Sequence, residues 1–83
     1  MKPYIRRRSD FIGSNPIAEE NDAGIIVVRD GNKYKIAVEM DVDTVVWVDE
    51  IKDRRALDGL IDSLIDKAPA IRKQFAGCRP DYT

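Results

Sequence analysis

The chain contains no histidine, and this absence limits its chemistry more than any other feature of the composition. Without imidazole groups there is no histidine general base, no serine–histidine or cysteine–histidine pair, and no nitrogen ligand of the kind that usually holds zinc. The side chains left for catalysis are carboxylates, lysines, tyrosines and one thiol. We therefore expect a protein that is not an enzyme and that uses neither a metal nor a cofactor.

Cysteine and long apolar runs are scarce as well. The one cysteine, Cys78, has no second thiol with which to form an intramolecular disulfide, as is typical of proteins in reducing compartments. No apolar run approaches the roughly 18 residues that span a bilayer, and the N-terminus lacks the apolar core of a signal peptide. We therefore expect a cytoplasmic protein with no membrane partner.

Neither sign of charge predominates in the sequence. The 83 residues include 14 basic and 15 acidic side chains, for a net charge of −1. No overall field therefore attracts the protein to nucleic acid or to anionic lipid, and any electrostatic preference must be local. Apolar residues make up 43% of the chain and charged residues 35%, which is the balance of one small globular domain with a thin core.

Residues 24–77 carry the patterns of an α+β domain. Two strand-like runs, 24–29 and 33–40, flank an Asp-Gly-Asn turn and predict a hairpin. A third strand is expected over 44–50, after a turn at 41–43, so the simplest sheet is a three-stranded antiparallel meander. In the second strand the side chains on the outer face are expected to be largely wet: Lys33, Lys35, Ala37 and Glu39.

A C-terminal helix follows the predicted strands. Asp53 is a good N-cap, and the apolar residues after it recur at spacings of three and four. Pro69 removes an amide donor, so the helix should kink or break there before it ends near Gly77. An amphipathic helix packed on one face of the meander gives a small two-layer α+β fold.

The segments on either side of this domain lack a regular period. Residues 1–23 form an N-terminal arm in which turn formers and blocks of charge interrupt every pattern, and residues 78–83 form a C-terminal tail. We expect part of the arm to dock on the domain or to add an edge strand to the sheet. The basis for this expectation is its large apolar side chains, namely Tyr4, Ile5, Phe11, Ile12 and Ile17.

The third strand departs from alternation, because the run from Val45 to Val48 is apolar throughout. If Val46 and Val48 face the helix, the two-residue period of a strand places Val45 and Trp47 on the outer face, beside Ala37. An apolar patch of this kind is rarely left bare. The arm, a second copy of the chain or a different protein should therefore cover it.

Asp58, Asp62 and Asp66 stand four residues apart, so they lie along one face of the predicted helix. Such a row is usually a solvated face. It can also act as a functional stripe, whose carboxylates mimic phosphates to a partner with a basic surface.

Arg6, Arg7 and Arg8 form a concentrated basic block in the arm. Three arginines can contact phosphates, which makes a nucleic-acid-binding accessory protein the first alternative, although three charges give only weak, salt-sensitive binding. The ordinary interpretation is a soluble arm, and no helix-turn-helix, zinc-finger or RNA-recognition signature accompanies the block.

A second alternative involves the acidic residues on either side of the third strand. Asp41 and Asp43 precede the strand, and the triplet Glu50-Ile51-Lys52 ends it. Over these few residues the pattern resembles the metal site of restriction-type nucleases, in which two carboxylates hold magnesium while a lysine steadies the attacking water or the phosphate. The ordinary interpretation is a solvated strand end beside a helix cap.

The leading hypothesis is a small interaction module that acts stoichiometrically on a partner protein or on a second copy of itself. It would be an inhibitor or adaptor of the kind that viruses and mobile elements encode, or a homodimer formed through the outer sheet face. The short chain, the missing histidine and the two-faced third strand favour this hypothesis. The predicted partner-binding residues are Trp47, Val45, Ala37, Asp58, Asp62 and Asp66.

Overall fold

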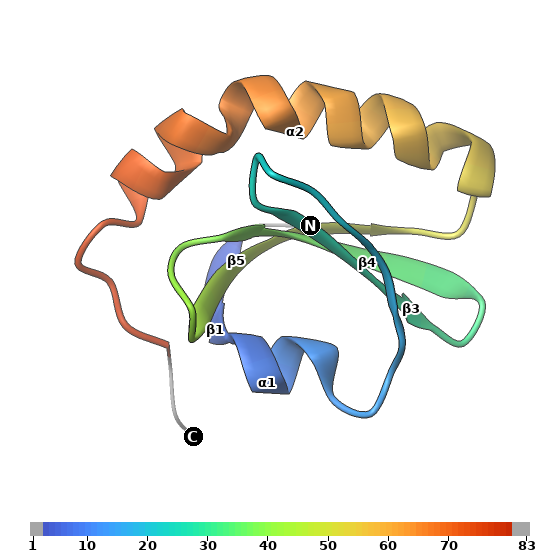
Figure 1. The fold of residues 1–83 in the computed structure, drawn as a ribbon, viewed down its shortest axis with the longest axis horizontal. Coiled ribbons are helices and arrows are strands. Elements are labelled where there is room, and N and C mark those ends of the chain that lie inside the picture. The colour runs from blue at the N-terminus through green and yellow to red at the C-terminus, as the bar shows by residue number, and fades with distance from the viewer. Residues whose placement is uncertain (1–2, 81–83) are drawn as a thin grey trace.

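A five-stranded antiparallel sheet carries a long helix on one face and a short helix on the other (Figure 1). The computed structural model describes residues 3–80, so residues 1–2 of the predicted arm and 81–83 of the predicted tail lie outside the described residues. The strands lie in the order β1-β5-β4-β3-β2 across the sheet. The elements are β1 (Tyr4–Arg7), α1 (Arg8–Ile12), β2 (Ile17–Glu20), β3 (Ile25–Asp30), β4 (Lys33–Glu39), β5 (Thr44–Ile51) and α2 (Arg54–Gln74).

The predicted antiparallel meander forms the centre of the sheet as β3, β4 and β5. The β3–β4 hairpin closes where Asp30 pairs with Lys33, and Gly31 occupies the turn at φ 63°, a conformation that other residues rarely adopt. The β4–β5 turn is held by Asp41, whose Oδ1 accepts hydrogen bonds from the amides of Asp43 (2.8 Å) and Thr44 (2.9 Å).

The N-terminal arm supplies the expected edge strand and also a second one that was not predicted, so that one strand is added to each edge of the meander. Strand β1 pairs with β5, with Tyr4 opposite Trp47, and β2 pairs with β3. Helix α1 lies between them in sequence and crosses the outer face of the sheet, opposite α2 (Figure 1). These elements have only four or five residues each and depend on contacts with distant strands. No periodic pattern in the sequence therefore predicts them.

Helix α2 begins as predicted, since the Asp53 side chain accepts a hydrogen bond from the amide of Arg55 at 2.9 Å. The helix does not break at Pro69 but runs through it to Gln74, and Figure 1 shows it curving over its C-terminal half. The apolar stripe continues on both sides of the proline, with Ala68 buried and Ile71 packed against the core. This packing offsets the hydrogen bond that proline cannot donate.

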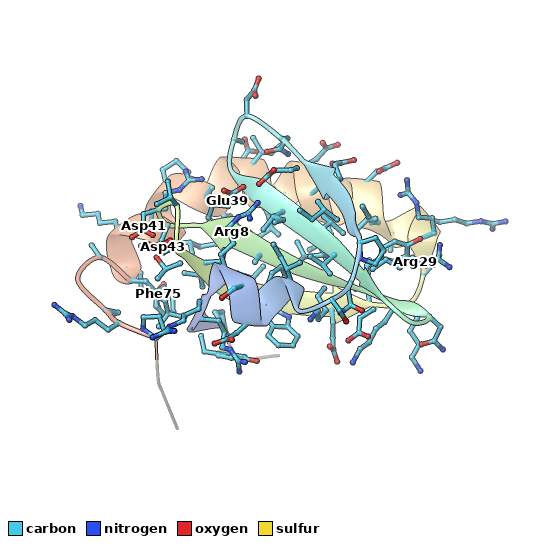
Figure 2. The ribbon with its side chains drawn as sticks, turned by 60° about the horizontal axis from the view of Figure 1, so that its bottom comes forward. Arg8, Arg29, Glu39, Asp41, Asp43 and Phe75 are labelled. Atoms are coloured by element: carbon cyan, nitrogen blue, oxygen red, sulfur yellow. The ribbon has the colours of Figure 1, made fainter. Side chains whose placement is uncertain are left out.

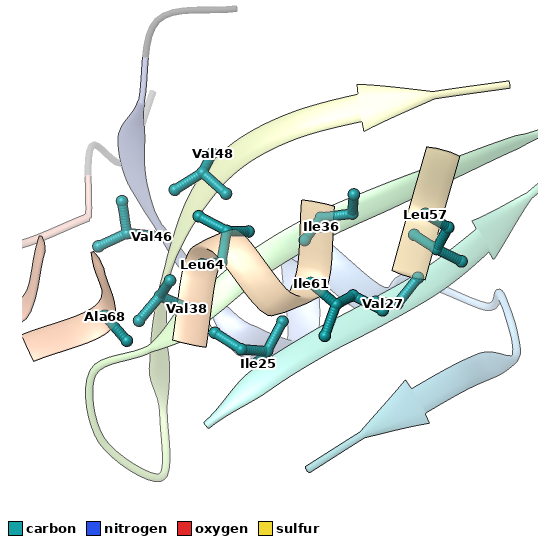
Figure 3. Packing of buried hydrophobic residues seen from close by; sticks show 10 residues of the cluster. All are labelled: Ile25, Val27, Ile36, Val38, Val46, Val48, Leu57, Ile61, Leu64 and Ala68. Carbon is teal, nitrogen blue, oxygen red and sulfur yellow. The ribbon is translucent and has the colours of Figure 1, made fainter. Parts of the chain in front are cut away.

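Two apolar clusters hold the layers together, one on each face of the sheet. The larger lies between the sheet and α2, where one stripe of the helix faces the strands (Figure 3). Its buried members are Ile25, Val27, Ile36, Val38, Val46, Val48, Leu57, Ile61, Leu64 and Ala68. The smaller lies on the α1 side and contains Phe11, Ile26, Val28, Ala37 and Val45. Within the described residues, no helix combines the length and apolar character needed to cross a membrane.

Candidate functional site

The outer face of the sheet is covered by the chain's own N-terminal arm. As predicted, Val46 and Val48 contact the α2 layer while Val45 and Ala37 belong to the opposite cluster. Phe11 of α1 is fully buried in that cluster, so Val45 and Ala37 are core residues with no exposed surface. The sequence left open whether the arm, a second copy or another protein covers this face, and in the structure the arm covers it.

Trp47 lies at the rim of this covered face and remains half-buried. Its ring contacts Phe11 edge to face, with centroids 5.6 Å apart, and Tyr4 at 5.4 Å. Its indole N–H donates to the carbonyl of Asp49 at 3.0 Å. Trp47 is thus the predicted sheet-face residue that keeps some surface for a partner.

The expectation of a largely wet outer face is wrong at Lys35, which is only 6% exposed. Its direction is as alternation predicted, but α1 covers the position. The Lys35 Nζ donates to the carbonyl of Phe11 at 2.6 Å and lies 5.2 Å from the ring centroids of both Phe11 and Trp47. The hydrogen bond and the two aromatic faces compensate the buried amine and fix α1 against the sheet.

A second polar contact between α1 and the sheet involves Arg8, Glu20 and Glu39. The Arg8 guanidinium forms an ion pair with Glu20 at 2.9 Å, and Figure 2 shows Arg8 beside Glu39. Hydrogen bonds from Glu39 and then Arg8 lower the pKa of Glu20. Burial, followed by the hydrogen bond and charge of Glu20, raises the pKa of Glu39. Glu39 therefore takes up a proton more readily than Glu20, in an arrangement that sequence reasoning missed because its members come from three elements.

The predicted acidic stripe lies on the exposed face of α2. Asp58, Asp62 and Asp66 are all exposed, and the helix buries its opposite side against the sheet. Asp58 is 3.5 Å from Arg54, an ion pair between two well-exposed side chains, whereas no ion pair to Asp62 or Asp66 occurs within residues 3–80. Ile65, 39% exposed, lies on the same side of the helix. The stripe is therefore a row of exposed carboxylates on a helix packed against the sheet, with an apolar side chain beside it.

The three arginines of the basic block are divided between two elements. Arg6 and Arg7 belong to the edge strand β1, whereas Arg8 opens α1 and pairs with Glu20. The Arg6 guanidinium lies 5.8 Å from the ring centroid of Tyr4. Because Glu20 neutralises Arg8, the block does not present three equivalent charges to a phosphate backbone.

The residues that resemble a nuclease site lie apart. Asp41 and Asp43 precede β5 whereas Glu50 and Lys52 are at its other end, and seven residues of extended chain separate Asp43 from Glu50 by about 23 Å. Glu50 is paired with the Nζ of Lys33 at 3.2 Å. Within residues 3–80 no three His, Cys, Asp or Glu side chains gather in a way that could hold a metal ion. The structure therefore does not bring these residues into one site.

A cluster that sequence reasoning missed lies where β3 ends, at the β3–β4 hairpin. Arg29 and Tyr34 face each other across the β3–β4 hairpin, and the Arg29 guanidinium carbon is 5.7 Å from the tyrosine ring centroid. The guanidinium carbon of Arg54, from the start of α2, is 5.9 Å from the same centroid. The hairpin register places Arg29 opposite Tyr34, so that pair could be predicted. No sequence signal indicates the approach of Arg54.

Comparison of the chain with protein-family models, curated proteins and solved structures gives no significant match.

Proposed function

We propose that the protein is a non-enzymatic interaction module that binds a partner protein with a basic surface through the exposed face of α2. It acts stoichiometrically, as an inhibitor or adaptor. The observation that carries this proposal is the row formed by Asp58, Asp62 and Asp66 on a helix whose other side is buried. Because each helical residue rises 1.5 Å, these carboxylates recur about every 6 Å along a fixed axis.

The acidic row is not explained by the stability of the fold. Like charges at positions i and i+4 of a helix repel each other by about 0.2–0.5 kcal/mol per pair. The Arg54–Asp58 contact, long and exposed, relieves little of this repulsion at the first position. A cationic partner surface would relieve it at all three, and Ile65 would supply an apolar contact within the same patch.

The outer sheet face supports the proposal less well. Val45 and Ala37 are fully buried beneath α1, so a partner or a second copy could reach them only after Phe11 had moved away. Trp47 alone among the predicted sheet residues retains exposed surface. The face of α2 needs no such rearrangement.

The proposal is tested by affinity capture from the source cells with charge-matched variants. The stripe variant carries Asp58→Asn, Asp62→Asn and Asp66→Asn. The control carries Asp10→Asn, Asp22→Asn and Asp43→Asn, which removes three exposed carboxylates elsewhere. We expect a partner that the native chain and the control retain, that salt elutes, and that the stripe variant retains at least tenfold less.

Recovery of the same proteins in the same amounts by all three baits would contradict a role for the α2 face. Circular dichroism of each bait verifies that the comparison is made between folded proteins.

A further inference from the structure

We propose that Arg29, Tyr34 and Arg54 form a binding site for a phosphate-bearing ligand. The three side chains line a cavity of about 360 Å³ between the edge strand β2, the β3–β4 hairpin and the first turn of α2. Cavities of this size are at the lower end of the range that holds small molecules or a single modified side chain. The site is distinct from the acidic stripe and goes beyond the proposed function.

The two guanidinium groups reach this cavity from different elements and converge on one ring. Their carbons lie 5.7 Å and 5.9 Å from the Tyr34 centroid. Tyr34 is half-buried, and Arg29 is anchored through its backbone amide, which donates to the carbonyl of Pro16 at 3.1 Å. The ring therefore serves as a fixed platform that holds two positive charges near each other.

Neither guanidinium is strongly committed to a contact within the chain. The Arg29 Nε donates to the carbonyl of Gly31 at 3.4 Å, a long hydrogen bond. The Arg54–Asp58 ion pair is 3.5 Å long, with side chains 60% and 78% exposed, so it is worth little in water. Since each guanidinium has five N–H donors, most of these donors remain for a ligand.

The charge around the cavity favours a ligand with more than one negative charge. Glu19 also lines the cavity and disfavours a weakly charged anion. A phosphate monoester carries a charge of about −1.5 to −2 at pH 7 and has three acceptor oxygens, which match two planar guanidinium forks. Arg8 is less available to an anionic ligand, because its guanidinium already forms an ion pair with Glu20 at 2.9 Å. Figure 2 shows Arg29 toward the end of the molecule where α2 begins, away from Arg8.

The test is an NMR titration of the ¹⁵N-labelled full chain with inorganic phosphate at constant ionic strength. Chloride and acetate serve as comparison anions. We expect saturable shifts centred on residues 29, 34 and 54. Arg29→Gln and Arg54→Gln should each weaken phosphate binding by at least about tenfold, as expected for the loss of a charge-assisted hydrogen bond. Arg55→Gln removes an exposed arginine from the same helical turn outside the cavity and should change the affinity by less than about twofold.

Several results would overturn the proposal. Shifts that do not saturate, that chloride reproduces, or that persist unchanged in both cavity variants would show that the arginines only pack against Tyr34. Acetate binding as tightly as phosphate would refute the assignment to a phosphate-bearing ligand. Both cavity variants change exposed side chains, and thermal unfolding verifies that each is folded.

Discussion

The ring of Phe11 meets the ring of Trp47 edge to face, with centroids 5.6 Å apart and planes inclined by 75°. This contact joins the short helix α1 to the interior strand β5, and the two lie far apart in sequence. It explains why the apolar third strand needs no external partner to cover its outer side. The N-terminal arm is a structural layer of the fold.

Phe11→Ala should therefore destabilise the protein by about 3–5 kcal/mol, because it empties a fully buried position in the smaller cluster. Urea denaturation followed by tryptophan fluorescence measures the change, since Trp47 is the only tryptophan. Ile12→Ala, at a half-buried neighbour, should cost less. A loss below about 1 kcal/mol for Phe11→Ala would show that the arm does not seal the sheet.

Residues 24–77 were predictable because their signals are local. Alternation and turn chemistry located the meander, and the three-and-four spacing located α2. The two-residue period of a strand also predicted that Val45 and Val46 point to opposite faces of the sheet. Lys35 shows where this reasoning ends: alternation gave its direction, but its burial depends on Phe11, which is 24 residues away in sequence.

Candidate sites were less predictable than the fold. The acidic stripe could be read from one helix, because its three members share a period. The contacts of Arg8 with Glu20 and of Arg54 with Tyr34 join different elements, and only the tertiary structure brings them together.

Gly24→Ala should cost more stability than Gly31→Ala. Both glycines have positive φ, 82° and 63°, so alanine strains each backbone by about 1–2 kcal/mol. A Cβ at Gly31 meets open space, whereas at Gly24 it clashes with the guanidinium of Arg72. That guanidinium would have to leave the carbonyls of Ala23 and Glu39. We expect an additional loss of about 1–2 kcal/mol by chemical denaturation.

A double variant isolates this clash. In an Arg72→Ala background the additional cost of Gly24→Ala should disappear, leaving the backbone strain alone. If the two glycine variants were equally stable in the native background, the hydrogen bonds of Arg72 would not hold α2 against the sheet.

Glu39→Gln should stabilise the protein at neutral pH. The pKa of Glu39 is raised above its ordinary value of 4.5 by burial and by Glu20, so the native state favours the protonated form. The contribution of that proton to stability is complete below pH 4.5 and is lost as the pH rises through the folded-state pKa. Arg8 and Arg72 act in the opposite direction and moderate the effect.

The pH dependence provides the measurement for this prediction. The stability advantage of Glu39→Gln over the native chain, taken from urea unfolding, should be largest near pH 7 and should shrink toward pH 4. An advantage that grew on acidification would mean that Glu39 is stabilised as a carboxylate.

Asp62→Asn should raise the unfolding free energy by about 0.4–1 kcal/mol at low salt, because it removes repulsion with both Asp58 and Asp66. At about 1 M salt the gain should vanish, since the Debye length is then only about 3 Å. Asp22→Asn, at an exposed position outside α2, should change stability little. A destabilising Asp62→Asn would imply that the fold itself requires the acidic row.

The most direct test of the proposed function is NMR mapping of the ¹⁵N-labelled chain with its captured partner. We predict shifts concentrated on the exposed face of α2, at Asp58, Asp62, Ile65 and Asp66, with the Trp47 indole unchanged. Shifts at the Trp47 indole and along β1 and β5, with α2 unaffected, would contradict the account and assign binding to the sheet face.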